Sequence, residues 1–392
     1  MTSLPAAGQQ AAERLRRSRF SGHVDRQLLA DVLVPFVATR VLLVIAGVMS
    51  ISMLHVASGA PLSWDIPHIP ALLVPFTRWD VTRYAYISLQ GYRAASWTTF
   101  FPLFPMLVRS AGAATGMTDL GGLATLSFLI ANGALLAATA GLVLLARLDF
   151  DRPTASRAAW YLLVFPSSLF LSAGYADSIF LALSIGMFLA ARRSRWLLAG
   201  LLAALAALDR PFGVLMVLPL ALEAWWQRSQ PGTWKALPAM VLAPLALGGY
   251  LAYLGSTFHD PLSFLHAESG WGRHLMTPWD TFTTFFSVAP TMGDAQHSIP
   301  DLLFTVFAIA VTVASWRLLR RSYALFLTAL LLVPLSSGTL LSMPRFVVAW
   351  FPVFLVLAIA GRRPEVDRLF LVSGAVLSTV LMLLFAQWYW VA

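Results

Sequence analysis

The sequence predicts an all-α polytopic membrane protein, and three observations lead to that class. Hydrophobic residues make up 58% of the 392 positions, charged residues make up only 11%, and the mean hydropathy is +0.74. Soluble domains have about 25% charged and about 45–50% apolar residues. The apolar residues stand in long runs, as membrane helices of about 20 residues require. This composition excludes a soluble enzyme and a disordered protein, and the long runs exclude a β-barrel, whose strands alternate.

The charge balance and the cysteine count narrow the class further. The net charge of +9 comes from 27 Lys and Arg against 18 Asp and Glu. In a membrane protein this excess belongs to cytoplasmic loops, so we expect no nucleic-acid partner. The chain has no cysteine, and hence neither a disulfide nor a thiolate metal site. Residues 1–30 are polar and basic without an apolar core, which predicts a cytoplasmic N-terminal tail and no cleaved signal.

Apolar runs between basic clusters predict about eleven transmembrane helices. Basic clusters such as Arg147, Arg152 and Arg157 are expected in the cytoplasm, where positive residues are retained. The predicted spans are 31–56, 121–146, 158–174, 177–191, 196–209, 211–226, 236–256, 301–319, 322–342, 346–361 and 369–391.

Placing the basic clusters in the cytoplasm requires two further interpretations. The apolar segment 101–117 must lie in the outer interface, because a crossing there would place Arg147 outside. The run 196–226 must be two half-helices broken at Asp209-Arg210-Pro211, because both of its ends are basic. Broken helices of this kind are tolerated where they line a protein cavity.

The predicted organisation is a single domain over residues 1–392 with two large outer loops. The first outer loop, 57–120, is expected to hold juxtamembrane helices, and the second covers 257–300. Most histidines and many acids fall in these loops or at the outer ends of spans, whereas the short inner loops hold mainly arginine. We therefore expect a multi-pass plasma-membrane protein with a cytoplasmic N-terminus and its site on the outer face.

The densest polar segment is Thr77–Tyr92, which has the pattern of an amphipathic helix at the outer surface. Asp80 and Arg83 stand three residues apart and share one face of that helix. A carboxylate beside Arg78 and Arg83 is suited to take a proton from a substrate hydroxyl. The alternative is that Asp80 caps the helix and pairs with Arg83. The predicted apolar stripe consists of Val81, Ala85, Leu89 and Tyr92.

Three further charged positions stand at span ends. Asp177 either caps the helix that begins there or belongs to a site. Asp209 and Arg210 stand at the helix break, where charges are costly and are functional by default, although a self-neutralising pair is the alternative. Arg345 is suited to bidentate binding of a lipid phosphate, or else extends to the headgroups as an anchor.

The second outer loop contains His259–His274, with three histidines, two acids, a tryptophan and an arginine. The histidines lack the close pairing of zinc signatures, so the metal signal is weak. We expect no certain cofactor, with a divalent metal left open. Trp271 and Arg273 better suit a sugar face and a phosphate, and His266 is included with them as a substrate-binding residue.

Several of these segments resemble one known family in order along the chain. RWDVTRYAYISLQGY followed by FFPLFPML resembles the most recognisable stretch of the second GPI mannosyltransferase (PIG-V-like) family. FPSSLFLSAGYADSIFLAL, LLAALAALDRPFGVL and MPRFVVAWFPVF are similar to its later segments, although Pro211 stands where the family often has Ser or Asn. The RWD, GY and FFPxFP series is the specific part.

This resemblance implies a GT-C glycosyltransferase fold with juxtamembrane helices in the first outer loop. It also implies a polyprenyl-phosphate sugar as donor, typically mannose, used on the non-cytoplasmic face, and it places the catalytic acid at Asp80. The acceptor does not carry over, because a cell with this chain need not make GPI anchors.

The leading hypothesis is an inverting, polyprenyl-phosphate-mannose-dependent mannosyltransferase. Asp80 is the general base, and Arg345 with Arg210 or Arg273 holds the donor phosphate. The donor lipid, a glycolipid or glycan acceptor and membrane lipids are its expected partners, and the half-helices are expected to form the groove for the polyprenyl tail. The alternative is a polyprenyl-lipid transporter or flippase, in which the same charges line a pathway. The remaining substrate-binding candidates are Arg78, Arg83 and Asp177.

Overall fold

A computed structural model describes residues 26–292 and 295–391, and every regular element within them is a helix. One isolated bridge between Thr291 and Ser298 is the extent of strand pairing in these ranges. The all-α class is thus confirmed for the described part of the chain. Residues 1–25, which include most of the predicted N-terminal tail, lie outside the described residues.

Five helices are long and apolar enough to cross a membrane. Since an α-helix rises about 1.5 Å per residue, about 20 residues reach across the hydrocarbon core. These helices are α2 (Arg26–Met53), α5 (Leu120–Ala146), α10 (Ala236–Phe258), α13 (Ile299–Leu318) and α17 (Pro364–Ala386).

Shorter helices occupy the other predicted spans, so the count of eleven crossings stays a prediction. They are α6 (Arg152–Val164), α7 (Asp177–Arg192), α8 (Trp196–Asp209), α9 (Val217–Trp226), α14 (Arg321–Leu335), α15 (Met343–Val348) and α16 (Pro352–Ala360).

Three of the predicted spans end early or are interrupted. The predicted span 158–174 ends as a helix at Val164. The predicted span 322–342 ends as a helix at Leu335, one residue after Pro334. The predicted span 346–361 is interrupted between α15 and α16, and α16 restarts with Pro352 at its first position. Proline lacks the N–H that a helix interior needs but is favoured at the first helical position, which explains the restart.

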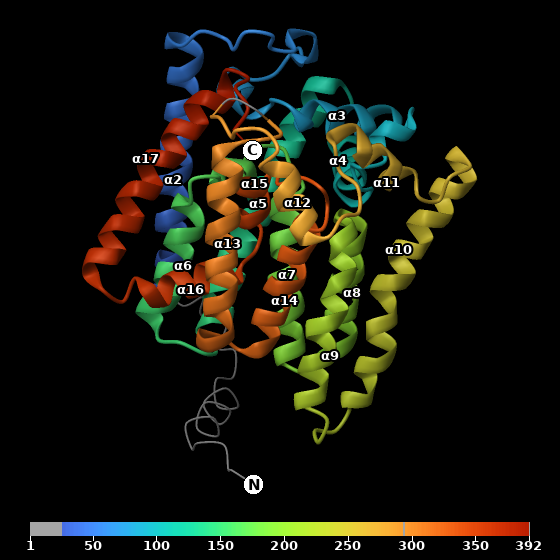
Figure 1. The fold of residues 1–392 in the computed structure, drawn as a ribbon, viewed down its shortest axis with the longest axis vertical. Coiled ribbons are helices and arrows are strands. Elements are labelled where there is room, and N and C mark those ends of the chain that lie inside the picture. Colours follow the sequence, from blue (N-terminus) through green and yellow to red (C-terminus); the bar gives the residue numbers. More distant parts are fainter. Residues whose placement is uncertain (1–25, 293–294, 392) are drawn as a thin grey trace.

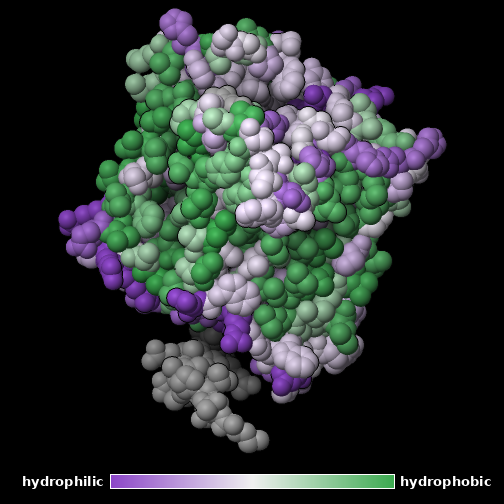
Figure 2. Space-filling model, in the orientation of Figure 1, coloured by the Kyte–Doolittle hydropathy of each residue, from purple (hydrophilic) through white to green (hydrophobic). Residues whose placement is uncertain are grey.

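The helices form one bundle, and α3 (Asp80–Gln90), α4 (Leu103–Thr115), α11 (Ser263–Glu268), α12 (Pro278–Phe285) and α15 gather at one end of it (Figure 1). α5, α7, α8 and α10 pack side by side in that order, and α17 packs on α2 at the opposite side of the bundle. α6, α14 and α16 contribute to the large hydrophobic core between these two groups. The surface over the long helices is hydrophobic on the face that Figure 2 shows, as lipid contact requires.

The predicted helix break is confirmed. α8 ends at Asp209, Arg210 is extended at φ −151° and ψ 144°, and a 3₁₀ segment, η5 (Pro211–Met216), leads into α9. The return is tight, because a Cβ at Gly213 would stand 2.2 Å from the carbonyl oxygen of Ala206. Asp209 and Arg210 therefore lie at the apex of a hairpin of half-helices.

The first outer loop folds into short helices that pack on the end of the bundle. α3 contacts both α4 and α5. α4 is about 20 Å long at the standard helical rise and is too short to cross, in agreement with the predicted interfacial segment. The short elements of both outer loops are η1 (Leu62–Trp64), η2 (Val74–Phe76), α3 (Asp80–Gln90), η3 (Ala95–Trp97), α4 (Leu103–Thr115), α11 (Ser263–Glu268), η7 (Ser269–Trp271) and α12 (Pro278–Phe285). Two further 3₁₀ segments are η4 (Ser168–Leu171) and η6 (Thr233–Lys235).

The apolar stripe predicted for α3 is partly wrong. Val81 and Ala85 are fully buried, but Leu89 is 42% exposed. Tyr84 and Ser88 are buried instead, because α3 is covered from two sides by α4 and α5 rather than from one. The buried face is therefore wider than a single stripe.

We expect residues 118 and 152 to lie on opposite sides of the membrane, since one long apolar helix, α5, separates them. Thr118 and Arg152 are exposed, and the chain has no native cysteine. In intact cells, Thr118→Cys should react with an impermeant maleimide and Arg152→Cys should react only after permeabilisation. Reaction of both cysteines in intact cells would contradict this topology.

Candidate functional site

Asp80 is the first residue of α3, and the chain reaches it through a strained residue. Trp79 has φ 57° and ψ −119° and makes no side-chain cap bond to the helix. Positive φ is costly for a bulky residue and is concentrated at functional sites. The guanidinium of Arg83 lies over the rings of Trp64 and Trp97. Asp80 is therefore in the first turn of α3 as predicted, but it is not the N-cap residue, and no hydrogen bond or ion pair joins it to Arg83 among the described residues.

The carboxylate of Asp80 instead pairs with Arg345, which is 265 positions away in the sequence. Arg345 also donates through Nε to Oδ2 of Asp177 at 3.1 Å. Nη2 of Arg210 lies 2.6 Å from the other oxygen of Asp177. The four side chains form a continuous acid–arginine chain, Asp80–Arg345–Asp177–Arg210, built from α3, α15, α7 and the apex after α8.

Asp177 is the centre of this acid–arginine chain and is completely buried. It begins α7, but its side chain makes no cap bond. A buried carboxylate is stable only if it is paired and hydrogen-bonded, and Asp177 contacts two guanidinium groups. Asp177 thus holds the guanidinium groups of Arg345 and Arg210 on either side of one buried carboxylate.

The backbone around Arg345 is fixed by its neighbours. The N–H of Met343 donates to Oδ1 of Asp301 at 2.9 Å, and the hydroxyl of Ser167 donates to the carbonyl of Pro344 at 2.6 Å. The ring of Tyr175 lies 4.4 Å from the guanidinium carbon of Arg345. Arg345 is thus held inside the bundle, and its interpretation as a headgroup anchor is wrong.

Asp209, beside Arg210 at the apex, is 2% exposed. Neither of its carboxylate oxygens has a hydrogen-bond partner in the part of the chain that the structure describes. Buried polar groups almost always have partners, so an exception indicates strain or a group awaiting a ligand. The apex pair is therefore not self-neutralising, since Arg210 pairs with Asp177.

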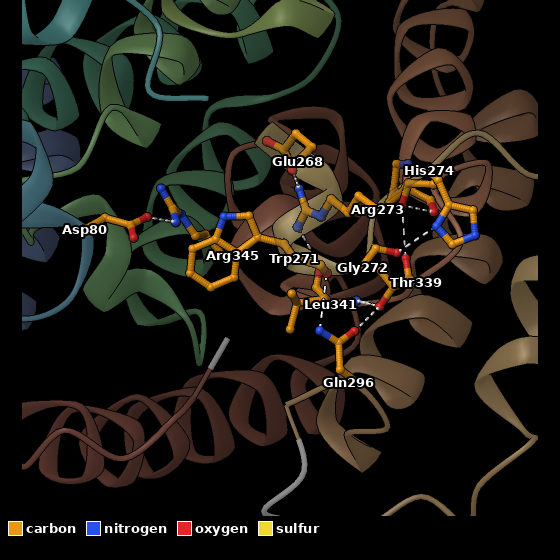
Figure 3. Close-up of polar contacts among 12 residues, drawn as sticks. Asp80, Glu268, Trp271, Gly272, Arg273, His274, Gln296, Thr339, Leu341 and Arg345 are labelled. Atoms are coloured by element: carbon orange, nitrogen blue, oxygen red, sulfur yellow. Dashed lines mark hydrogen bonds and ion pairs between the residues drawn. The ribbon is translucent and has the colours of Figure 1, made fainter. Parts of the chain in front are cut away.

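The second outer loop brings Arg273 and Trp271 to the same end of the bundle (Figure 3). Arg273 donates to Glu268 at 3.2 Å and to the carbonyl of Leu341 at 3.1 Å, and its guanidinium lies over Phe346. Burial lowers the pKa of Arg273, and the charge of Glu268 opposes that shift. In Figure 3 the indole of Trp271 stands between Arg345 and Arg273.

Two predicted site residues have other partners. Arg78 pairs with Asp65 and donates to the carbonyl of Ala386 at 3.1 Å, so it joins the first outer loop to the end of α17. His266 has a side chain that is 71% exposed and pairs with Asp260 at 2.7 Å. That hydrogen bond lowers the pKa of Asp260. Neither residue belongs to the acid–arginine chain.

A small recess opens beside Asp80 and Arg345 and has a volume of about 20 Å³, enough for one water molecule. Its walls are mostly aromatic. The lining residues are Trp79, Asp80, Phe170, Tyr175, Ser342, Arg345, Phe385, Trp390 and Val391. The sequence alone did not single out Tyr175, Trp390 or Val391 as site residues. The available signal was the aromatic run Trp388-Tyr389-Trp390, which is unusually aromatic for the end of a span.

A larger apolar cavity of about 270 Å³ lies between α6, α13, α16 and α17. It is lined by Tyr161, Val164, Phe165, Pro166, Leu303, Phe304, Phe307, Leu357, Phe370, Ser373, Gly374 and Leu377. The expected groove was at the half-helices α8 and α9, whereas this cavity is on another side of the bundle. Both half-helices instead pack against α7 and α10, and η5 packs on α8.

No group of three or more His, Cys, Asp or Glu side chains arranged to hold a metal occurs within residues 26–292 and 295–391.

Comparison with known proteins gives distant structural likenesses only. No family model and no curated protein matches the chain. Among solved structures, it is similar to the oligosaccharyltransferase AglB of Archaeoglobus fulgidus. The apo form gives a TM-score of 0.44 at 14% identity over 90% of this chain and 56% of AglB. The complex with an inhibitory peptide and a dolichol-phosphate gives 0.43 at 14% identity over 90% and 56%. The complex with Zn and sulfate gives 0.43 at 14% identity over 89% and 53%.

The chain thus spans about half the length of the structures that it matches. The geometry defines a helical membrane protein with a buried acid–arginine chain at one end of its bundle. The function proposed below rests on that chain and not on the likeness to AglB.

We expect Asp177→Asn to destabilise the protein strongly, because it leaves two buried guanidinium groups without their shared carboxylate. Breaking a buried pair by removing one partner typically costs about 3–5 kcal/mol. Denaturation in mixed micelles should show this loss, and Asp280→Asn, at an exposed outer-loop carboxylate, serves as the control. Equal stability of the two variants would contradict the central role of Asp177.

Proposed function

We propose that the protein is a GT-C membrane glycosyltransferase. It transfers mannose from a polyprenyl-phosphate-mannose donor to a lipid-linked or glycan acceptor on the non-cytoplasmic face, with inversion at the anomeric carbon. The observation that carries the proposal is the contact between Asp80 and Arg345 at one end of the bundle. A partly exposed carboxylate and a guanidinium in contact are the two groups that this reaction needs. Mannose as the sugar follows from the sequence resemblance.

Asp80 is the general base in this proposal. Its side chain is 22% exposed, against none for Asp177, so it is the acid of the chain that a substrate can reach. The acceptor hydroxyl attacks the anomeric carbon, its proton passes to a carboxylate oxygen of Asp80, and the bond from the anomeric carbon to the phosphate oxygen breaks. The leaving group is the polyprenyl phosphate.

The phosphate of the donor is held by Arg345, with Arg210 or Arg273 as a second contact. The planar fork of arginine matches two oxygens of a phosphate. Arg345 is divided between Asp80 and Asp177, so a phosphate can replace Asp80 while Asp177 keeps the guanidinium oriented. The charge that develops on the leaving phosphate is then stabilised by a group that is already in place.

The polyprenyl tail fits the apolar cavity between α13 and α17. Pro166 lines that cavity, and the next residue, Ser167, donates to the carbonyl of Pro344, adjacent to Arg345. The part of the cavity that Pro166 lines is therefore near the proposed phosphate position at Arg345. A lipid whose phosphate contacts Arg345 can place its chain between membrane helices, where apolar surface is favoured.

The transporter alternative receives no support from the arrangement of charges. Other buried or partly buried ion pairs, Asp31 with Arg147, Asp149 with Arg192 and Glu223 with Arg320, are at helix ends that lead into the basic loops. Between them and the acid–arginine chain lies the large apolar core. Arg40 of α2 is also partly buried inside the bundle, but it donates to Ser172 and to the carbonyl of Leu163. A pathway for a charged headgroup would need a continuous row of polar residues through the core.

We expect Asp80→Asn to lower sugar transfer by about 10²–10⁴-fold, the contribution that positioned general bases typically make. Asparagine keeps the size and can still accept a hydrogen bond from Arg345, but it does not take up a proton. Transfer from radiolabelled polyprenyl-phosphate-mannose by membranes that contain each variant measures the effect.

Asp280→Asn is again the matched control and should transfer sugar normally. The result that opposes the assignment is an Asp80→Asn protein with the wild-type rate at neutral pH. If the wild-type protein consumes none of the polyprenyl-phosphate sugars offered, the proposed function itself fails.

The tail position is tested by two adjacent residues of α17. Ser373 lines the apolar cavity, whereas Val372 is 65% exposed and outside it. Ser373→Trp should raise the Michaelis constant for a long-chain donor by about tenfold, since overpacking typically costs about 1–3 kcal/mol and about 1.4 kcal/mol is tenfold. A ten-carbon citronellyl donor should be affected less, and Val372→Trp should change neither. Equal behaviour of both variants with both donors would place the tail elsewhere.

A further inference from the structure

The recess beside Asp80 has a chemical character that the donor does not require. Two of its lining residues have a positive φ angle, 57° at Trp79 and 71° at Ser342. A third, Trp390, follows the end of α17. Aromatic rings form most of its wall, and one carboxylate and one guanidinium are its charged groups.

Two indole N–H groups at this end of the molecule have no partner. Nε1 of Trp388 and Nε1 of Trp390 are buried without a hydrogen-bond acceptor in the described residues. Trp388 is otherwise fixed, because it is 2% exposed and the guanidinium carbon of Arg78 lies 5.0 Å from its ring. An unpaired buried donor costs free energy unless a ligand supplies the acceptor.

Trp390 is held more loosely than the residues before it. The turn after α17 is fixed by Gln387, whose side chain donates to the carbonyls of Ser50 and Leu54, and by the N–H of Tyr389, which donates to Leu384. Within the described ranges, no such backbone bond holds residues 390 and 391. The ring of Trp390 is placed by its edge-on contact with Trp79, with centroids 5.4 Å apart at 90°.

The combination of aromatic walls, a carboxylate and the free indole donor of Trp390 matches a sugar or cyclitol ring. Such a ring has apolar C–H faces that pack on indole and a rim of hydroxyls that need acceptors and donors. An open-chain alcohol offers no flat face. At about 20 Å³ the recess holds one water, so a ring enters only if Trp390 moves aside.

We propose that this recess is the acceptor subsite, that it takes a sugar or cyclitol ring, and that Trp390 is its movable wall. The inference rests on the proposed function, because Asp80, which lines the recess, is the group that would accept the proton of the ring hydroxyl. Trp390 stacks on the ring after moving from Trp79, and its N–H donates to a ring hydroxyl. The wall also keeps water from the donor when no acceptor is bound.

Binding is tested without any sugar transfer. The full-length protein in nanodiscs is mixed with methyl α-mannopyranoside or myo-inositol, and saturation transfer from protein to ligand is measured by NMR. Sorbitol, an open-chain hexitol with as many hydroxyls as inositol, is the matched ligand control. At least one ring ligand should receive saturation and sorbitol should not. Trp390→Ala should remove most of the signal, and Trp390→Phe, which keeps a ring, should keep part of it.

Trp279→Ala is the matched protein control, because Trp279 is 76% exposed on α12 and does not line the recess. It should bind as the wild type does. Equal saturation of sorbitol and the ring ligands, or an undiminished signal in Trp390→Ala, would overturn the subsite.

An assay of sugar transfer distinguishes a failure of the ring subsite from a failure of the proposed function. Release of polyprenyl phosphate is measured without acceptor and with octyl mannoside or 1-O-octylglycerol. The wild type should prefer the ring acceptor, and Trp390→Ala should reduce that preference at least fivefold while hydrolysis of the donor by water rises. Donor turnover without ring preference contradicts the subsite alone. Ring binding without donor turnover contradicts the proposed function and leaves the ring subsite supported.

Discussion

The completely buried carboxylate of Asp177 is the interaction on which the site depends. A charge in that position is tolerated only because two guanidinium groups face it, Arg345 at 3.1 Å and Arg210 at 2.6 Å. Each arginine comes from a segment with no long helix of its own: α15 has six residues, and Arg210 is the extended residue between α8 and η5. Asp177, at the start of α7, thus fixes the positions of α15 and of the break between α8 and η5.

Arginine is needed in this position for a geometric reason. Arg345 contacts carboxylates on two helices at once, through Nε on one side and Nη1 on the other. A lysine ammonium has donors but no planar fork to divide between two fixed partners.

The sequence predicted where the helices lie and which charged residues are unusual, but it did not predict which residues those charges pair with. Apolar runs located a helix at every predicted span, because membrane helices must satisfy their backbone internally and are therefore read from composition alone. Asp80, Asp177, Arg210 and Arg345 were recognisable because charge is rare in such surroundings. Their pairing was not, because it depends on how α3, α7 and α15 pack.

The same limit explains the incorrect expectations. Asp80 and Arg83 are three residues apart, and local spacing favours their pairing, yet Arg83 lies over two indole rings and Arg345 takes the carboxylate. The tail groove was expected at the half-helices because broken helices often line cavities. Here the close packing at Gly213 fills that space, and the cavity forms where α13 and α17 are separated.

The shared role of Arg345 has a consequence for the order of events. While Arg345 holds the Asp80 carboxylate, that carboxylate is engaged by the guanidinium and is not free to accept a hydrogen bond from an acceptor hydroxyl. A donor phosphate that binds Arg345 competes with Asp80 for the same donors, whereas Asp177 on the opposite side of the guanidinium remains in place. Binding of the donor in the proposed reaction then frees the Asp80 carboxylate for the acceptor hydroxyl at the moment when the sugar is present. In the proposed reaction, the acid–arginine chain thus couples occupation of the donor site to activation of the acceptor.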